Sequence, residues 1–227
     1  MNAETVGVVI PAYQAADTVG DVIRRCKRLA DIAGVIVVDD GSSDGTGDFA
    51  RKEGAIVITH QTNSGKGAAL VTGFAEATRR DWDAVITIDA DGQHDPRFIP
   101  AFLQHWIDTN ADVIIGVRQR DDTPMPFSRR LSNAMSSAVV SRLANARVID
   151  SQSGYRLIAR RVWETLRFER TRYDMESELL IKAGRAGYRI AEVPITTVYD
   201  AEQSHFRAFR DTFRMARVFV SLWREVE

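Results

Sequence analysis

The chain has 227 residues, with 30 Lys and Arg, 31 Asp and Glu, and a formal net charge of −1. This length suits one large α/β domain or two small ones, and a composition of 44% hydrophobic and 27% charged residues argues against disorder. The chain has no excess of positive charge, so nothing points to a nucleic acid partner. The single Cys26 argues against a disulfide-stapled protein, and the start of the chain argues against a secreted one. The lack of a long apolar run argues against an integral membrane protein.

Short apolar runs alternate with amphipathic stretches over the first half of the chain. We predict strands at residues 6–10, 35–38, 55–59, 84–88 and 113–117, and helices at 17–29, 46–53, 65–79 and 96–106. The first strand should end at Pro11, and Cys26 should be an inert thiol within the first helix. This alternation is typical of βαβ crossovers, so the sequence predicts a mostly parallel sheet with helices on both faces.

The second half has a different pattern. Residues 118–130 are polar and contain two prolines, so we expect a loop there, and residues 150–156 indicate a polar turn. We predict helices at 131–146, 173–184 and 208–224, and an edge strand over 190–199 that Pro194 interrupts. No repeat or linker divides the chain, which favours a single domain.

Ligands of such sheets bind beyond the carboxyl ends of the strands, where this sequence places polar clusters. The clusters are residues 11–13, 39–45, 63–67 and 89–95. At a strand end, Asp40 can accept hydrogen bonds from a nucleobase or a ribose; the alternative is a purely structural turn, with Asp40 and Ser42 in an Asx-type turn and Asp44 capping a helix. Lys66 opens a helix and can face an anion, although its segment lacks the Walker A spacing.

The last of these clusters has the pattern of a metal site. Asp89 and Asp91 follow an apolar strand on one face, and Gln93 adds an amide oxygen. Oxygen ligands of this kind suit Mg²⁺ or Mn²⁺, which also bind substrate phosphates. The alternative is a structural turn rich in Asp and Gly. We expect His94 to be a solvated neighbour, because the oxygen set already suits a hard metal.

Several motifs occur in a fixed order along the chain. They are residues 9–13 (VIPAY), 37–46 (VVDDGSSDGT), 63–67 (NSGKG), 89–94 (DADGQH), 116–118 (GVR), 150–156 (DSQSGYR), 176–178 (ESE) and 187–195 (GYRIAEVPI). Together they resemble family 2 glycosyltransferases of the GT-A fold, and most of all the polyprenol-phosphate sugar transferases of the dolichyl-phosphate mannosyltransferase type. The resemblance runs from about residue 6 to residue 207.

The resemblance implies an α/β fold of the Rossmann-like GT-A type, a mostly parallel sheet flanked by helices, with an amphipathic carboxy-terminal helix. One domain would cover residues 1–227, with a nucleotide-sugar-binding half at 6–117 and an acceptor-binding half at 118–227. The implied reaction moves a hexose, mannose or glucose, from a nucleotide sugar to a polyprenyl phosphate, with inversion and with Mg²⁺ or Mn²⁺ as cofactor.

The resemblance also implies roles for single residues. The implied donor-binding residues are Pro11, Tyr13, Asp40, Lys66, Asp89, Ala90, Asp91 and Gln93. Of these, Asp91 and Gln93, together with Asp89, would hold the metal. The family often carries Asn-Glu after the tyrosine, whereas this chain has Gln14 and Ala15, so the choice between GDP and UDP stays open.

A lipid monophosphate acceptor is already ionised and needs no general base, but two anions must then be held side by side. Guanidinium groups suit that task, and the resemblance implies that Arg118 lies between the two phosphates. Asp91 and Arg118 are therefore the expected catalytic residues. The expected acceptor-phosphate residues are Arg118, Arg129, Arg130, Ser132 and Arg207. The alternative is that these are ordinary solvated surface side chains.

A sugar or glycan hydroxyl is the alternative acceptor, and it would require a base. Asp150, Asp174 and Glu176 are the candidates, although Glu176 can instead pair on its own helix. A sugar nucleotidyltransferase would carry a Gly-rich basic loop where residues 11–13 stand, and a binding module without activity would not need Asp91.

The carboxy-terminal stretch combines apolar and basic strips at helical spacing. The apolar residues are Phe206, Phe209, Phe213, Ala216, Val220 and Trp223. Such a helix can lie on a bilayer or pack on protein, and a lipid acceptor favours the bilayer. We therefore expect a cytoplasmic protein that binds peripherally to the inner face of the membrane.

Overall fold

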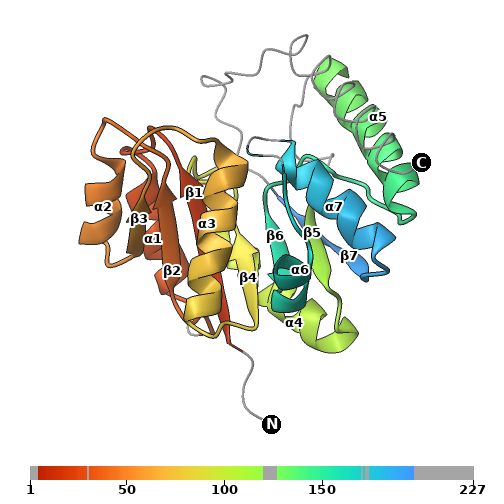
Figure 1. Cartoon of the computed structure of the whole chain (residues 1–227), viewed down its shortest axis with the longest axis horizontal. Coiled ribbons are helices and arrows are strands. Elements are labelled where there is room, and N and C mark those ends of the chain that lie inside the picture. Colours follow the sequence, from red (N-terminus) through yellow and green to blue (C-terminus); the bar gives the residue numbers. More distant parts are fainter. Residues whose placement is uncertain (1–4, 30, 120–126, 170, 172–173, 197–227) are drawn as a thin grey trace.

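The computed structural model of the chain describes residues 5–29, 31–119, 127–169, 171 and 174–196, and of residues 127–132 only the backbone. Within these residues a seven-stranded sheet has the order β3-β2-β1-β4-β6-β5-β7 (Figure 1). The strands are β1 (Val6–Ala12), β2 (Val35–Asp39), β3 (Ile56–Thr59), β4 (Ala84–Thr87), β5 (Val113–Arg118), β6 (Arg156–Ala159) and β7 (Ile190–Ile195). Neighbouring strands are parallel except at β6, which runs antiparallel to β4 and β5.

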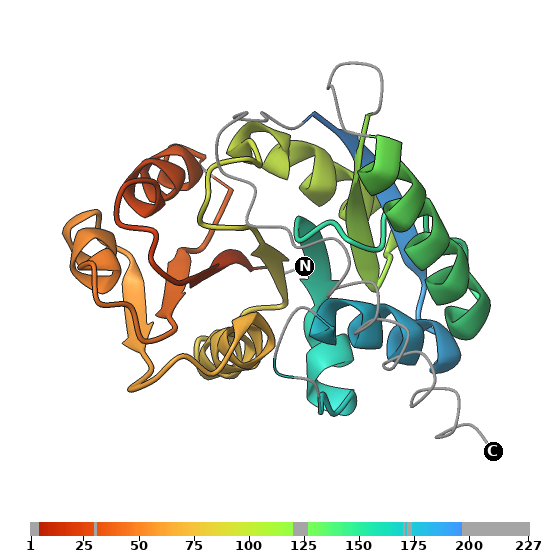
Figure 2. The same ribbon diagram turned by 90° about the horizontal axis from the view of Figure 1, so that it is seen from above.

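Helices cover both faces of this sheet. They are α1 (Val19–Lys27), α2 (Thr46–Lys52), α3 (Lys66–Arg79), α4 (Ile99–Thr109, after a 3-10 turn at Pro96–Phe98), α5 (Phe127–Ala144), α6 (Arg160–Thr165) and α7 (Met175–Arg185). Seen from above, α1 and α4 lie on one side of the sheet and α3, α6 and α7 on the other (Figure 2). Each face has its own apolar core. The predicted α/β fold with a mostly parallel, doubly covered sheet is confirmed.

Helix α1 shows how the sequence pattern becomes a packed layer. Val19, Val22, Ile23 and Cys26 recur at helical spacing, and all four are fully buried against the sheet. Burial of each large aliphatic side chain contributes about 1.5–3 kcal/mol. Cys26 lies inside this helix, as predicted, and burial raises the pKa of its thiol to about 12. A thiol in that state is inert, because the thiolate is the reactive form.

Two prolines lie within strands that they were expected to end or interrupt. β1 continues through Pro11 to Ala12, and β7 continues through Pro194 to Ile195. Among the described strands, β7 pairs with β5 alone, so an edge strand needs donors on one side only and tolerates the missing N–H of Pro194. Pro11 stands next to last in its strand, where little of the ladder follows it.

β6 and α6 were not predicted from the sequence, and α5 begins before the helix predicted at 131–146. The expected loop over 118–130 overlaps the first turn of α5, which begins at Phe127. β6 has only four residues, and its first, Arg156, belongs to the segment predicted as a polar turn. The Arg156 guanidinium is nevertheless buried, because it donates to the backbone carbonyls of Ser151, Ser153 and Glu176. The helix expected over 208–224 lies outside the described residues.

The topology collects the polar clusters at one edge of the sheet, the upper edge in Figure 1. The carboxyl ends of β1, β2, β4 and β5 meet there, and antiparallel β6 brings its amino end to the same edge. The segment that precedes β6 therefore faces the cluster after β4. Among helices in the described part of the chain, none combines the length and apolar character that crossing a bilayer takes.

Candidate active site

The loop after β1 is fastened to the turn after β2. Gln14 adopts a left-handed backbone with φ of 51°, and its N–H donates to Ser42 Oγ at 3.0 Å while its Nε2 donates to Ser43 Oγ at 3.0 Å. Pro11 is buried within β1, whereas the ring of Tyr13 is 51% exposed. An exposed aromatic residue thus follows the carboxyl end of β1, and a residue of this kind can stack on a flat ligand.

The turn after β2 has the structural role that the sequence analysis kept as an alternative, with one change of residue. Asp39, rather than Asp40, closes it, because Ser42 N–H donates to Asp39 Oδ1 at 3.1 Å. Asp44 accepts the N–H of Thr46 at 3.0 Å and so supports the start of α2. This leaves the Asp40 carboxylate for a different partner.

Asp40 is 3% exposed and supports the loop before α3. Its Oδ1 accepts Ser64 N–H at 2.9 Å, and its Oδ2 accepts Gly65 N–H at 2.7 Å. His60 Nδ1 lies 2.7 Å from Asp40 Oδ1, and its Nε2 lies 3.0 Å from Thr72 Oγ1 of α3. The sequence analysis did not single out His60; its position after β3, at the same sheet edge, was the available signal. A direct contact of Asp40 with a nucleoside stays a prediction.

Lys66, the first residue of α3, was expected to face an anion of the donor. Its Nζ lies 2.5 Å from Asp89 Oδ1 and 3.0 Å from Glu176 Oε1. Burial alone would lower the pKa of Lys66, but the two carboxylates outweigh burial and raise it, so the ammonium stays charged. Lys66 thus joins the cluster after β4 to the first turn of α7.

Asp89 and Asp91 differ in their electrostatic surroundings. Burial opposes ionisation of Asp89, yet Lys66 and His94 lower its pKa. Asp91 accepts Gln93 N–H at 3.0 Å, and both partial burial and the negative charge of Asp89 raise its pKa. No lysine or arginine of the described residues pairs with Asp91. A divalent cation would relieve this excess of negative charge.

The ligands at this point fit such a cation only in part. Carboxylate and amide oxygens of Asp91 and Gln93 are of the type that Mg²⁺ and Mn²⁺ prefer. The described residues form no group of three or more His, Cys, Asp and Glu side chains able to hold a metal. A metal here would therefore be completed by water and by phosphate oxygens of a substrate, as is usual for these ions.

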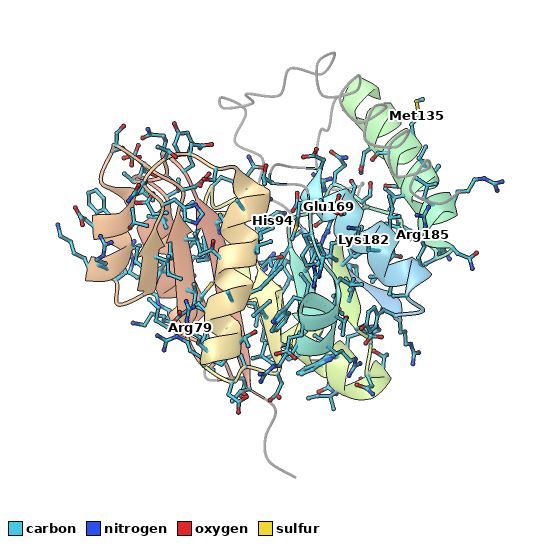
Figure 3. The ribbon with its side chains drawn as sticks, in the orientation of Figure 1. Arg79, His94, Met135, Glu169, Lys182 and Arg185 are labelled. Atoms are coloured by element: carbon cyan, nitrogen blue, oxygen red, sulfur yellow. The ribbon has the colours of Figure 1, made fainter. Side chains whose placement is uncertain are left out.

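His94 differs from expectation, because it is buried rather than solvated. Its ring centroid lies 5.4 Å from that of Tyr155, and its Nδ1 lies 3.8 Å from Asp89 Oδ2. Within the described residues, Nδ1 has no hydrogen-bond partner. Figure 3 shows His94 near the middle of the molecule. The prediction failed because the antiparallel β6 brings Tyr155 over this position, a neighbour that the sequence did not reveal.

Arg118, at the end of β5, is joined to the segment before β6. Its Nε donates to Asp150 Oδ2 at 2.7 Å and its Nη2 to Asp150 Oδ1 at 2.8 Å, while Asn133 Nδ2 of α5 donates to the same Oδ1 at 3.1 Å. Burial would raise the pKa of Asp150, but the hydrogen bonds and charge of Arg118 lower it. Asp150, a candidate base for a hydroxyl acceptor, is thus a strongly held carboxylate.

The remaining predicted site residues are described in part or not at all. Arg129, Arg130 and Ser132 belong to α5, with side chains outside the described set, and Arg207 lies outside the described residues. Ala90 is buried beside the two aspartates. Asp174 precedes α7, and its Oδ1 is buried without a hydrogen-bond partner among the described residues.

Comparison with known proteins places these observations in a family. The model of the family described as glycosyl transferase family 2 matches residues 7–188. An undecaprenyl-phosphate mannosyltransferase of Micrococcus luteus is 32% identical over 204 residues, covering 84% of this chain and 82% of the relative. A dolichyl-phosphate hexose transferase of Haloferax volcanii is 32% identical over 193 residues, covering 85% and 82%.

The fold is also found among solved structures. Glucosyl-3-phosphoglycerate synthase of Mycobacterium tuberculosis superposes with a TM-score of 0.78 at 24% identity, covering 96% of this chain and 80% of that one. A structure of the same synthase with Mn²⁺, uridine diphosphate and its product has a TM-score of 0.75 at 23% identity, covering 97% and 78%. The likeness supports the GT-A type of fold.

Proposed function

Because the chain belongs to glycosyl transferase family 2, we propose that it is a metal-dependent inverting transferase that moves a hexose from a nucleotide sugar to a polyprenyl phosphate. The observation that carries the acceptor class is the pair of relatives at 32% identity, both aligned over more than four fifths of each chain and both named for lipid-phosphate acceptors. The family itself establishes that the chain is a glycosyltransferase.

The donor in this proposal is a UDP- or GDP-hexose bound across the upper edge of the sheet. The exposed ring of Tyr13 would stack on the base beside Pro11, and Asp40 would act on the nucleoside through the loop that it holds. Asp89, Ala90 and Lys66 would lie along the ribose and diphosphate. The neighbour solved with uridine diphosphate supports a nucleoside diphosphate of this kind.

The proposed cofactor is Mg²⁺ or Mn²⁺, held by Asp91 and Gln93, with Asp89 close by. When bound, such an ion neutralises the charge that develops on the departing diphosphate. The raised pKa of Asp91 supports this placement, because burial and the negative charge of Asp89 disfavour its ionised form and a divalent cation would offset both. The Mn²⁺ in the neighbouring synthase supports a divalent metal in general.

The acceptor phosphate would attack the anomeric carbon from the face opposite the diphosphate, so the configuration inverts. Arg118 would lie between the two anions, with Arg129, Arg130, Ser132 and Arg207 as further proposed contacts. A phosphate monoester is ionised at neutral pH and needs no base. In agreement, Asp150 and Glu176, two of the three candidate bases, each hold a cationic side chain.

A hydroxyl acceptor is the second candidate, and one observation favours it. Asp174 has a buried oxygen without a hydrogen-bond partner among the described residues. A carboxylate that accepts the proton of a substrate hydroxyl would have such an unsatisfied oxygen before the substrate binds. A base role for Asp174 would give a product that stays in the aqueous phase.

A lipid acceptor also implies a place of action. We propose that the protein works in the cytoplasm at the inner face of the membrane, bound peripherally, because a polyprenyl chain does not leave the bilayer. The stretch over residues 208–224 is the proposed contact, and it lies outside the described residues.

The proposal is tested with purified full-length protein, Mg²⁺ or Mn²⁺, polyprenyl phosphate in detergent, and a panel of radiolabelled UDP- and GDP-hexoses. We expect label in the organic phase with at least one donor, and its loss with EDTA or with Asp91→Ala. Arg79→Ala, at the exposed end of α3 on the lower side of the molecule in Figure 3, is the control and should retain activity. Label that enters only a soluble glycan would support the hydroxyl alternative instead.

A further inference from the structure

A buried lysine is shared between two carboxylates that come from distant parts of the chain. Lys66 opens α3, Asp89 follows β4, and Glu176 lies in the first turn of α7. The side chains of Lys66 and Glu176 are 15% and 10% exposed, so water screens this contact little. The ammonium therefore depends on both carboxylates for its solvation.

We propose that Glu176 is a positioning residue for the donor site, which acts through Lys66 to hold Asp89 and does not take a proton from the acceptor. The inference rests on the proposed function, because Asp89 is the residue placed along the ribose and diphosphate of the donor. Glu176 belongs to the predicted acceptor half, so the lysine bridge connects that half to the donor site.

The location of Lys66 explains why a second carboxylate is needed. A cation at the amino end of a helix meets the positive end of the helix dipole, and the first turn of α3 contains no acidic residue. Glu176 has the opposite situation, because a carboxylate at the amino end of α7 is favoured by its dipole. The negative charge of Glu176 therefore offsets the unfavourable position of the Lys66 ammonium, and the ion pair joins the amino ends of two helices.

A hydrogen bond from the Arg156 side chain fixes the backbone at Glu176. The buried guanidinium of Arg156 donates from Nη1 to the carbonyl of Glu176 at 2.7 Å, and from Nε and Nη2 to the carbonyls of Ser153 and Ser151 at 2.8 and 2.9 Å. One side chain thus ties the first turn of α7 to the segment before β6. Glu176 is held in place as a rigid anchor, which is what a positioning residue requires.

The same segment covers the ion pair. A Cβ at Gly154 would lie 2.7 Å from Asp89 Oδ2 and 2.8 Å from Lys66 Nζ, which only a glycine avoids. Thr87 Oγ1 of β4 fixes this approach by donating to the Gly154 carbonyl at 2.8 Å. Asp89 and Lys66 are therefore enclosed by β4, the segment before β6 and α7, and have little freedom to separate.

The test measures nucleotide binding without any acceptor, so it is independent of the acceptor class. Full-length protein is titrated calorimetrically with UDP and with GDP in the presence of Mn²⁺. We expect Glu176→Gln to weaken binding of the preferred nucleotide about tenfold, since Lys66 loses one anchor and Asp89 its fixed position. The double variant Lys66→Met/Glu176→Gln should bind within about twofold of Lys66→Met alone, because Glu176 acts through that lysine.

Glu178→Gln is the matched control. Glu178 occupies the same turn of α7, is even more deeply buried than Glu176, and pairs with Lys182 of its own helix at 2.7 Å. We expect it to leave nucleotide affinity within about twofold of the wild type. Glu176→Asp, which keeps the charge on a shorter side chain, should fall between Glu176→Gln and the wild type and serves where Glu176→Gln does not fold.

Two results would overturn the proposal. One is unchanged nucleotide affinity in Glu176→Gln with turnover reduced by about a hundredfold or more, which is the signature of a general base. The other is a loss of nucleotide affinity in Lys66→Met/Glu176→Gln that equals the sum of the losses in the two single variants, expressed as free energies. If the wild type binds neither nucleotide, the proposed donor is wrong. The midpoints of urea unfolding of the wild type, the two single variants and the double variant then test whether Glu176 acts through Lys66. Non-additive shifts of the midpoint support a role through Lys66, and additive shifts reject it.

Discussion

The Arg118 guanidinium donates two parallel hydrogen bonds to the Asp150 carboxylate, from Nε at 2.7 Å and from Nη2 at 2.8 Å. This bidentate pair joins the end of β5 to the segment before β6. It fixes the plane of the guanidinium relative to Asp150. The planar fork, and not the positive charge alone, is therefore what the site requires of this residue.

Replacing Arg118 with lysine tests that requirement. Arg118→Lys keeps the charge but loses the second hydrogen bond to Asp150, so we expect turnover with polyprenyl phosphate to fall by roughly 10- to 100-fold. Calorimetric affinity for the nucleotide should change by no more than about threefold. Steady-state kinetics with both substrates varied is the measurement. Arg97→Lys, an exposed arginine, is the control, and equal losses in the two variants would contradict the role of the fork.

The same pair predicts how stability depends on pH. Arg118 keeps the pKa of Asp150 lower in the folded than in the unfolded chain, where an aspartate titrates near pH 3.9. The carboxylate therefore stabilises the fold fully above about pH 3.9, and this contribution is lost as the pH falls through the folded-state pKa. Asp150→Asn should lower the free energy of unfolding by about 2 kcal/mol at pH 7.

Urea unfolding at a series of pH values checks this expectation. The difference in free energy of unfolding between the wild type and Asp150→Asn should narrow as the pH falls below about 4, because Asp150, which only the wild type has, is then protonated in the unfolded chain. A difference that stays constant or widens with acid would show that the Asp150 carboxylate contributes nothing through its ionised form. Asp81→Asn, whose carboxylate is 91% exposed, provides the control.

The burial of Cys26 predicts its reactivity. Since burial raises the pKa of this thiol to about 12, almost no thiolate exists at pH 8 in the folded chain. We expect an aromatic disulfide reagent to label Cys26 only as fast as the protein unfolds, and at once in denaturant. Absorbance at the release of the aromatic thiol follows the rate. Rapid labelling under native conditions would contradict the packing of α1 against the sheet.

Close contact between α5 and α7 depends on Gly184. A Cβ there would lie 2.2 Å from the backbone oxygen of Ala144, which cannot move aside without shifting the end of α5. We expect Gly184→Ala to lower the free energy of unfolding by about 2–3 kcal/mol. Gly20→Ala, in α1 with its nearest neighbour at 3.5 Å, is the opposite case and should gain up to about 1 kcal/mol from helix propensity. Equal effects in thermal unfolding would contradict the contact.

The regular elements of the first half could be predicted because their apolar spacing is strong and their ends carry turn residues. The strand β6 could not, because it is short and begins with Arg156, whose burial depends on carbonyl groups of the preceding turn and on that of Glu176, 20 residues away. The motif residues after β1, β2 and β4 were found for the same reason as the strands, since they follow clear apolar runs.

The interaction partners of those motif residues could not be predicted from the sequence. Periodicity places Lys66 at the start of a helix but does not show that Asp89 and Glu176 surround it, because that contact follows from the order of strands in the sheet. Asp150 likewise looked like a candidate base until its pairing with Arg118 was visible. Pairings across the sheet edge are tertiary facts, and they changed the role of each carboxylate.

The most direct test of the proposed reaction follows phosphorus. Polyprenyl phosphate is incubated in detergent with the wild-type protein, the donor that the radiolabel panel selects and Mg²⁺, which unlike Mn²⁺ is diamagnetic, and ³¹P NMR is recorded before and after. We expect the phosphate monoester signal to be replaced by that of a phosphodiester as nucleoside diphosphate appears, and Asp91→Ala to prevent both changes. Release of nucleoside diphosphate with the lipid monoester signal unchanged would contradict transfer to the lipid phosphate.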